Sequence, residues 1–276
     1  IPKSFIKNQA IVYTVQKGTG VNEIKYDLEK KGIIKSSLFF KLYTIISNNY
    51  SKLQAGRYNL SSSMSIAIIV RKISSGDTIK DKITIIEGWN IKDIAEYLES
   101  KNIYSQKEFL DLIKQDFSNS YEFLKDKPQK LNLEGYIFPD TYEVFLGEKP
   151  GDLLKNILSN FNKKLNPDLV KEIKAQKKSI FKIVTMASII EKEVKSIEDK
   201  KIVSGILWKR IENNMPLQVD STVNYITGRS EARVAIKDTK IDSLYNTYKY
   251  VGLPLGPISN PGIDSILAAI YPKNSQ

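Results

Sequence analysis

One acidic residue, Glu191, stands beside a stripe of apolar residues in the segment 183-IVTMASIIEKEVKSIEDK-200. The spacing predicts a helix from Lys178 to about Ile197, whose apolar face is formed by Ile183, Ala187, Ile190, Val194 and Ile197. With Ala187 at zero, Glu191 lies about 40° and Glu193 about 240° around this helix. A carboxylate at the edge of an apolar face should lose hydration, which raises its pKa. A raised pKa is what a general acid needs near neutral pH.

Glu191 also has an ordinary interpretation as a surface charge. It could flank the stripe and pair with Lys195, which follows one helical turn later. Taken alone, the helical pattern favours this interpretation. Glu193 points away from the apolar face and is expected to be solvated.

The residue types that are missing narrow the possible chemistry. The chain has no histidine and no cysteine. A Ser-His-Asp triad, a cysteine nucleophile and a zinc site made of histidines or thiolates are therefore excluded. Acid–base catalysis near neutral pH must come from Glu, Asp, Lys or Tyr.

Two polar segments follow the helix of Glu191. The first is a polar turn after a helix at 204–212, and it contains Gln218, Asp220, Ser221, Thr222 and Asn224 within seven positions. Such side chains suit hydrogen bonding to amides and hydroxyls. The second, 245-YNTYKYVGLPLGPISNPG-262, is broken by Gly and Pro and must follow a fixed irregular path before a helix at 260–270. Long ordered loops of this kind are more often functional than decorative.

A third segment, 131-LNLEGYIFPDTYEVFLG-147, combines aromatic residues with Glu134, Asp140 and Glu143. Aromatic rings beside carboxylates could form a cleft in which sugars stack. They could equally form a hairpin core with solvated acids, and we favour the core.

The first half of the chain contains an internal repeat. Residues 15–39 align with residues 85–109 at an offset of 70, which pairs Gly18 with Gly88, Leu28 with Leu98 and Phe39 with Phe109. Each copy predicts a short strand, a turn at Gly and an amphipathic helix. Strand–helix–helix–strand units of this size suit a small carbohydrate-binding module, although βα units are also common scaffolding.

The length and net charge of the chain limit the number of domains and the kinds of partner that we expect. The 276 residues suffice for one large or two modest domains, and 42 Lys and Arg against 31 Asp and Glu give a net charge of +11. This charge favours anionic partners, but no Arg-rich stripe or compact nucleic-acid motif is present, so we expect no nucleic-acid partner. No apolar run is long enough to span a membrane. Because the first residue is Ile, we expect a processed form, which a signal peptide or anchor could have preceded.

Five motifs carry a resemblance to a known family. LEGYIFPDTY, ASIIEKEV, PLQVDSTVNYITG, YNTY and GLPLGPISNPG occur in this order, and AGRYNL and IIEGWNIKDIAEYL match the amino-terminal part. Together they closely resemble the YceG-like family of endolytic murein transglycosylases, over nearly the whole chain.

The resemblance implies an α+β fold with a LysM-like βα repeat region followed by an α+β catalytic domain. It divides the chain into a LysM-like domain (1–82), a second βα repeat with a helical connector (83–130) and a catalytic transglycosylase domain (131–276). It also implies a single-pass anchor in the cytoplasmic membrane that is not part of this chain, with the catalytic domain facing the periplasm or cell wall. The implied partners are peptidoglycan glycan strands and peptidoglycan synthases such as penicillin-binding proteins.

The family's catalytic glutamate corresponds to Glu191. The resemblance implies internal cleavage between N-acetylmuramic acid and N-acetylglucosamine, which leaves 1,6-anhydromuramic ends and requires no metal or cofactor. We predict that substrate is bound by Gln218, Asp220, Thr222, Tyr245, Asn246 and Tyr136. Glu134 and Asp140 could instead position other groups. The alternatives are a non-catalytic peptidoglycan-binding or scaffolding protein, and a hydrolase that uses Asp220 or Glu134 to place water.

Overall fold

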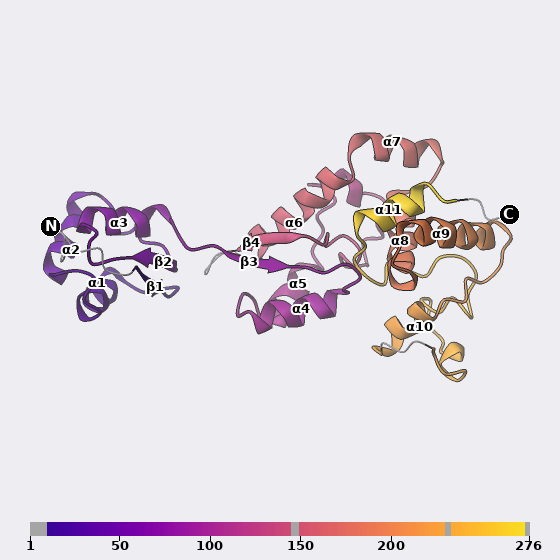
Figure 1. Cartoon of the computed structure of the whole chain (residues 1–276), viewed down its shortest axis with the longest axis horizontal. Coiled ribbons are helices and arrows are strands. Elements are labelled where there is room, and N and C mark those ends of the chain that lie inside the picture. The colour runs from indigo at the N-terminus through magenta and orange to yellow at the C-terminus, as the bar shows by residue number, and fades with distance from the viewer. Residues whose placement is uncertain (1–9, 145–148, 230–232, 274–276) are drawn as a thin grey trace. The chain divides into compact units, whose positions relative to one another are not determined.

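The computed structural model describes residues 10–144, 149–229 and 233–273. The first nine residues of the predicted LysM-like domain and the FLG end of the 131–147 segment lie outside these ranges. The chain forms two compact units, one made of residues 1–83 and 143–149, the other of residues 84–142 and 150–276. The chain passes from one unit to the other within β3 (Asp81–Thr84) and β4 (Thr141–Val144), which form a two-stranded sheet (Figure 1).

The first unit starts with a strand, two helices and a second strand. These are β1 (Ile11–Val15), α1 (Val21–Lys30), α2 (Ser37–Ile46) and β2 (Gly56–Leu60), followed by α3 (Ile66–Ser75). β1 and β2 pair antiparallel with Tyr13 opposite Tyr58. Because side chains alternate along a strand, Tyr58 and Leu60 both point into the core, and Gly56 is buried on the same face. The hydroxyls of Ser36 and Ser65 accept hydrogen bonds from backbone N–H groups and so cap the amino-terminal ends of α2 and α3.

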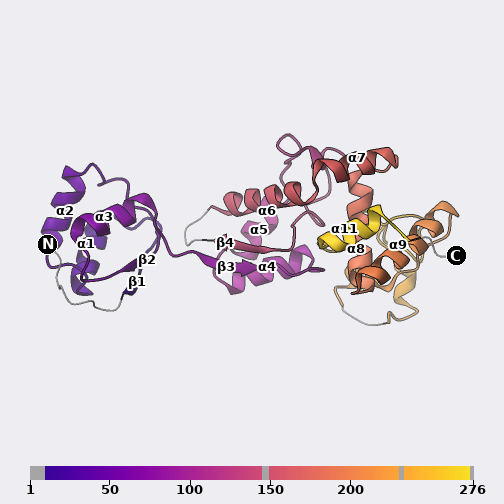
Figure 2. The ribbon, with the colours of Figure 1, turned by 45° about the horizontal axis from the view of Figure 1, so that its top comes forward.

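The core of the first unit lies between the helices and the sheet. Its fully buried members include Ile24, Leu28, Phe40, Tyr58, Leu60, Ile69 and Ile73. In Figure 2, α2 lies beside α1 and α3, and it packs against both. The second copy of the repeat has the same order of elements, since β3, α4 (Ile91–Ser100) and α5 (Gln106–Leu112) precede β4. The assignment of the two repeat copies as LysM-like stays a prediction, and so does the division of the chain into three domains.

The second unit is mainly helical. After α4, α5 and the short 3-10 helix η1 (Glu122–Leu124) come α6 (Pro150–Lys164), α7 (Pro167–Ala175), α8 (Ile180–Glu193), α9 (Ile197–Glu212) and α10 (Asp220–Thr227). The 3-10 helix η2 (Asp238–Lys240) and α11 (Ile263–Ile270) complete the unit. Capping boxes at Asn90–Asp93 and Ser105–Glu108 begin α4 and α5. Small sheets combined with these helices make the fold α+β, as predicted.

α8 is the central helix of the second unit. All residues from Ile183 to Ile190 are buried, and α7, α9, α10, α11 and η1 pack against the helix. Figure 1 shows α11 lying across α8 and α9. A helix that is buried on every side needs no single apolar face, so the stripe read from the sequence covers only part of its buried surface.

The predicted helix from Lys178 to Ile197 is wrong at its carboxyl end. α8 stops at Glu193, because Val194 is extended (φ −146°, ψ 156°). The Ser196 hydroxyl then accepts a hydrogen bond from Asp199 N and begins α9. Val194 and Ile197 are therefore not part of the α8 face. The predicted polar turn at 218–224 is also shorter than expected, since Asp220 already begins α10.

Candidate active site

Glu191 lies in the last turn of α8 and both of its carboxylate oxygens are engaged. Lys200 Nζ lies 2.9 Å from Oε1, and the backbone N–H of Gly262 donates to Oε2 at 2.8 Å. The side chains of Glu191 and Lys200 are only 7% and 4% exposed. Glu191 is therefore a desolvated carboxylate, and its partner comes from α9 rather than from Lys195.

The loop from Ile258 to Gly262 is hydrogen-bonded along the second half of α8. Ile258 N donates to Ser188 Oγ at 3.0 Å, and Ser259 Oγ donates to Ser188 O at 2.9 Å. At the end of this loop, the backbone N–H of Gly262 donates its hydrogen bond to Glu191. A Cβ atom at Gly262 would overlap the carboxylate of Glu87, so the close approach shown here requires either glycine or a different position of the Glu87 side chain. The GLPLGPISNPG motif thus provides the N–H group that contacts Glu191.

Asn260 joins three segments that are distant in sequence. Its Nδ2 donates to Glu134 Oε1 at 2.9 Å and to Trp89 O at 3.0 Å. Its Oδ1 accepts from Ile137 N at 2.9 Å. The Asn260 side chain is fully buried, so these protein hydrogen bonds take the place of the hydrogen bonds that it would make with water. Asn260 therefore fixes the loop of Trp89 and the LEGYIF segment around the end of α8.

Glu134 is a second buried acid in this network. It accepts hydrogen bonds from Asn260, from Ile91 N at 3.1 Å and from Tyr225 Oη at 3.3 Å. Burial nevertheless raises the pKa of Glu134 to about 8, although these donors oppose the shift. The burial of Glu134 therefore favours its protonated form. The sequence favoured a core in which the acids of this segment are solvated, and this prediction is wrong for Glu134, whose side chain is buried by the Trp89 loop and the loop of Asn260.

Asp140 lies in a different network. Its Oδ2 accepts from Asn160 Nδ2 at 3.0 Å, and its Oδ1 accepts from Thr141 N at 2.8 Å. Burial would raise the pKa of Asp140, but these two donors and Lys164 outweigh it and lower the pKa. No hydrogen bond within the described ranges links Asp140 to Glu191.

Two further acids surround the end of α8. Burial raises the pKa of Glu87, and the charge of Glu191 raises it further, while Lys200 opposes the shift. Desolvation also raises the pKa of Glu193; Ser221 opposes this shift and Asp220 adds to it. Glu193, predicted to be solvated, is exposed, and it also interacts with Ser221 in the first turn of α10.

The predicted binding residues Gln218, Asp220 and Tyr245 retain accessible surface. Gln218 is exposed in a left-handed conformation (φ 55°), and its Oε1 accepts from Arg210 Nη1 at 3.3 Å. Asp220 Oδ1 accepts from Tyr248 Oη at 2.5 Å. Tyr245 is half-buried and stacks beside Tyr225 with ring centroids 5.0 Å apart. Tyr245 also lines a pocket of about 310 Å³ with Lys114, Lys130, Leu131 and Asn132.

The other three predicted binding residues, Thr222, Asn246 and Tyr136, are buried. The Thr222 hydroxyl lies 2.9 Å from that of Thr247, and Thr247 Oγ1 also accepts from Val219 N. Asn246 Nδ2 donates to the carbonyls of Thr239 and Ile241, at 2.9 and 2.8 Å. Both side chains are fully buried. Their contacts hold the loops that carry Gln218, Asp220 and Tyr248 and leave no surface for a sugar.

Tyr136 lies in an aromatic cluster with Phe123 and Phe161, whose ring centroids are 6.0 and 5.4 Å away. It is fully buried, and its hydroxyl has no hydrogen-bond partner within the described residues. The preceding Gly135 (φ 88°) packs so closely on Pro257 and Val184 that a Cβ there would clash. In this conformation Tyr136 packs the core and cannot contact substrate.

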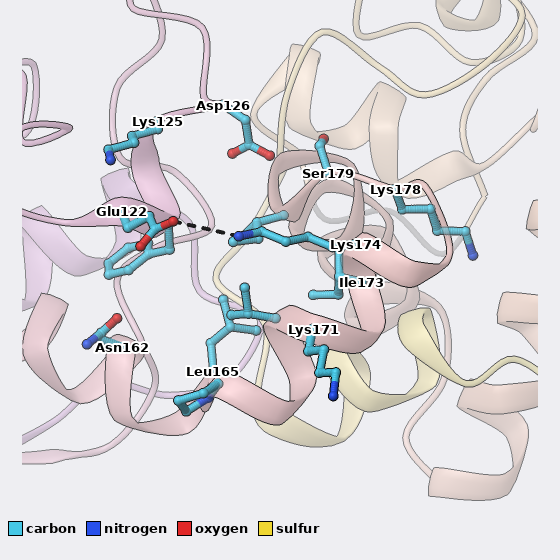
Figure 3. A pocket seen from close by; sticks show the side chains of 14 residues that line it. Glu122, Lys125, Asp126, Asn162, Leu165, Lys171, Ile173, Lys174, Lys178 and Ser179 are labelled. Atoms are coloured by element: carbon cyan, nitrogen blue, oxygen red, sulfur yellow. Dashed lines mark ion pairs between the residues drawn. The ribbon is translucent and has the colours of Figure 1, made fainter.

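A larger pocket of about 720 Å³ lies at the other end of α8, lined by Ser179 and Ile180. Figure 3 shows Lys174 extending toward Glu122, at a distance of 3.6 Å. Ser179 precedes Glu191 by twelve residues, which is roughly 18 Å along a helix. The pocket is thus separate from the Glu191 site. No group of three or more acidic side chains within the described residues could hold a metal ion.

Sequence reasoning missed Lys200 and Glu87, and it did not assign roles to Asn260, Gly262 and Tyr225. Asn260 and Gly262 lie within the ISNPG part of a motif that was recognised, so the motif itself was a usable signal. Lys200 gave no such signal, because nine residues and a helix break separate it from Glu191.

Fold and site together define an α+β protein with an acid-centred site at the end of one buried helix. The chain belongs to the YceG-like family, whose family model matches residues 13–276. A Bacillus subtilis protein named endolytic murein transglycosylase is 35% identical over 95% of this chain and 75% of its own length. A Streptococcus pneumoniae protein of the same name is 31% identical, but the chain spans only 52% of it. A crystal structure of a YceG-like protein from Listeria monocytogenes is 32% identical, with a TM-score of 0.64 over 97% of this chain and 91% of that one.

Proposed function

We propose that this chain is an endolytic murein transglycosylase that cleaves glycan strands between N-acetylmuramic acid and N-acetylglucosamine and leaves 1,6-anhydromuramic ends. The observation that carries the proposal is the placement of Glu191, which is desolvated and contacted by Lys200 and Gly262 N–H. Membership of the YceG-like family and the names of the Bacillus and Streptococcus relatives support it.

One acid can perform this reaction if the substrate supplies the nucleophile. Protonated Glu191 donates its proton to the glycosidic oxygen, and the bond from this oxygen to C1 of the muramic residue breaks. The carboxylate that forms is stabilised by Lys200 and by Gly262 N–H. It then accepts the proton of the muramic C6 hydroxyl as that oxygen bonds to C1, so Glu191 ends protonated again. Acid–base assistance of this kind contributes about 10²–10⁴-fold.

The surrounding residues divide into two proposed roles. Gln218, Asp220 and Tyr245 have accessible surface with which to contact N-acetyl and hydroxyl groups of the glycan. Thr222, Asn246 and Tyr136 act through packing and loop geometry. Orientation of the strand and of the C6 hydroxyl supplies the rest of the rate enhancement.

The two copies of the amino-terminal repeat provide a second proposed contact with glycan. Both copies of the repeat have a strand–helix–helix–strand order, which supports a LysM-like, carbohydrate-binding role. The family resemblance further supports a site of action at the cell-wall face of the cytoplasmic membrane, beside peptidoglycan synthases. Among the described residues no helix is both long and apolar enough to cross a bilayer.

Digestion of purified peptidoglycan followed by mass spectrometry tests the proposal. A transglycosylase releases products with anhydro ends, whereas a hydrolase that uses Asp220 or Glu134 to place water releases products heavier by one water. A protein that only binds glycan sediments with peptidoglycan and releases no soluble product. The second or the third outcome would overturn the proposed activity.

A further inference from the structure

Helix α2 of the first unit carries its largest apolar side chains on the outside. Leu38, Phe39, Leu42, Tyr43, Ile45 and Ile46 are all exposed, whereas only Phe40 and Thr44 are buried. At 100° per residue, the six exposed residues fall within an arc of about 160° that lies opposite the buried stripe. An ordinary surface helix turns its apolar face inward. We call these six residues the outer face of α2.

An exposed apolar face of this extent indicates a binding surface. Ile46 is 81% exposed and Phe39 is 65% exposed, so neither contributes much to the core of the unit. The aliphatic side chains of Leu38, Leu42 and Ile45 offer no hydrogen bonds, which argues against a sugar or a polar peptide as the occupant. Ser36 caps the helix, so its geometry does not depend on an additional partner.

The charge around α2 identifies the kind of surface that it fits. From residue 30 to residue 76 the chain has eight Lys and Arg residues and no Asp or Glu, and the acid nearest to α2 is Glu29, which accepts a hydrogen bond from Ser37 N. Lys35 precedes α2 in the sequence, Lys52 follows it, and both are exposed, while Lys41 lies at the edge of the outer face. None of these three lysines forms an ion pair with a residue of the described ranges. An apolar helix face with unpaired lysines before, on and after the helix is complementary to an anionic phospholipid surface.

We propose that the outer face of α2 docks onto the surface of an anionic phospholipid bilayer. The helix lies in the plane of the interface, its Leu, Ile and Phe side chains enter the boundary of the acyl chains, and Lys35, Lys41 and Lys52 contact headgroup phosphates. Tyr43 places an amphipathic ring at the same level. This inference is independent of the role of Glu191, because it concerns only the first unit.

Flotation of the 276-residue chain with lipid vesicles tests this inference. We expect binding to vesicles of about three parts phosphatidylcholine to one part phosphatidylglycerol, much weaker binding to phosphatidylcholine alone, and weaker binding at high salt. F39S/I46S should lower the partition coefficient about tenfold or more. Because both side chains are exposed, the far-ultraviolet circular dichroism and the melting temperature should not change.

Ile46 and Ile236 provide a matched pair, since they are the same residue type and are 81% and 80% exposed. I46S should weaken vesicle binding, and I236S should leave it unchanged. Equal loss in both variants, or no binding of the unaltered chain to either vesicle, would overturn the inference. It would also be overturned if the chain formed dimers in sedimentation experiments that F39S/I46S abolished, without binding vesicles. That result would make the outer face a contact between copies of the chain.

Discussion

The Lys200 ammonium lies 2.9 Å from the Glu191 carboxylate, and both side chains are nearly inaccessible to water. A buried pair of this kind costs desolvation energy, which its mutual attraction only partly returns. The pair is therefore better explained by what it does to Glu191 than by the stability it adds. In the proposed reaction, Lys200 stabilises the carboxylate that remains after Glu191 has given its proton to the leaving group.

Glu191→Gln should abolish release of anhydro products, with a loss of at least about 10²–10⁴-fold. Glutamine has the same shape but cannot donate the proton. The measurement is mass spectrometry of digested peptidoglycan. Glu198→Gln is a suitable control, because Glu198 is exposed on α9 and should leave the activity intact. Full activity of Glu191→Gln would remove this residue from the mechanism.

Lys200→Met should destabilise the second unit by roughly 3–5 kcal/mol, because it leaves Glu191 as a buried charge without its partner. Chemical denaturation measures this loss. In the double variant E191Q/K200M no buried charge remains, so most of the stability should return while the activity stays absent. If the two single losses simply add in the double variant, the residues are not energetically coupled.

Glu134 should make the protein less stable as the pH rises. Its pKa is about 8 in the folded chain against an ordinary value of 4.5, so the folded state holds a proton that the unfolded chain has released. The free energy of unfolding should therefore fall between about pH 4.5 and about pH 8 and level off above. Glu134→Gln should remove this part of the pH dependence, whereas Glu96→Gln, at an exposed position of α4, should not. Urea denaturation across the pH range provides the measurement.

Gly262→Ala should lower activity strongly. The added Cβ overlaps the Glu87 carboxylate, so either this flexible side chain turns aside or the loop shifts and its N–H moves away from Glu191. Gly151→Ala is the matched control, because no atom lies within 4 Å of a Cβ built there. Shortening Glu87 in G262A/E87A should restore part of the activity relative to G262A. No gain in the double variant would show that the clash is not the cause.

Much of the site could be predicted from the sequence because its polar residues stand in compact motifs. Local patterns drew attention to Glu134, Gln218, Asp220 and the irregular path before α11, whereas the family resemblance, not the helical pattern, made Glu191 the catalytic candidate. The α+β class was also predicted, since strand and helix periods are local properties. The order of elements in each repeat could be read for the same reason.

Local sequence patterns could not show which residues contact each side chain of the site. Helical periodicity continued past Glu193, where tertiary contacts end α8, and it therefore suggested Lys195 where the structure places Lys200. The burial of Tyr136 and Asn246, and the protonation of Glu134, depend on which segments surround them. The same holds for α2, whose composition was plainly apolar but whose outer face is known only because its neighbours leave it uncovered.

The sequence determines which residues can carry charge and protons. Only the tertiary structure decides which of them lose water and which partner they meet, because burial and pairing depend on residues that are distant in the chain.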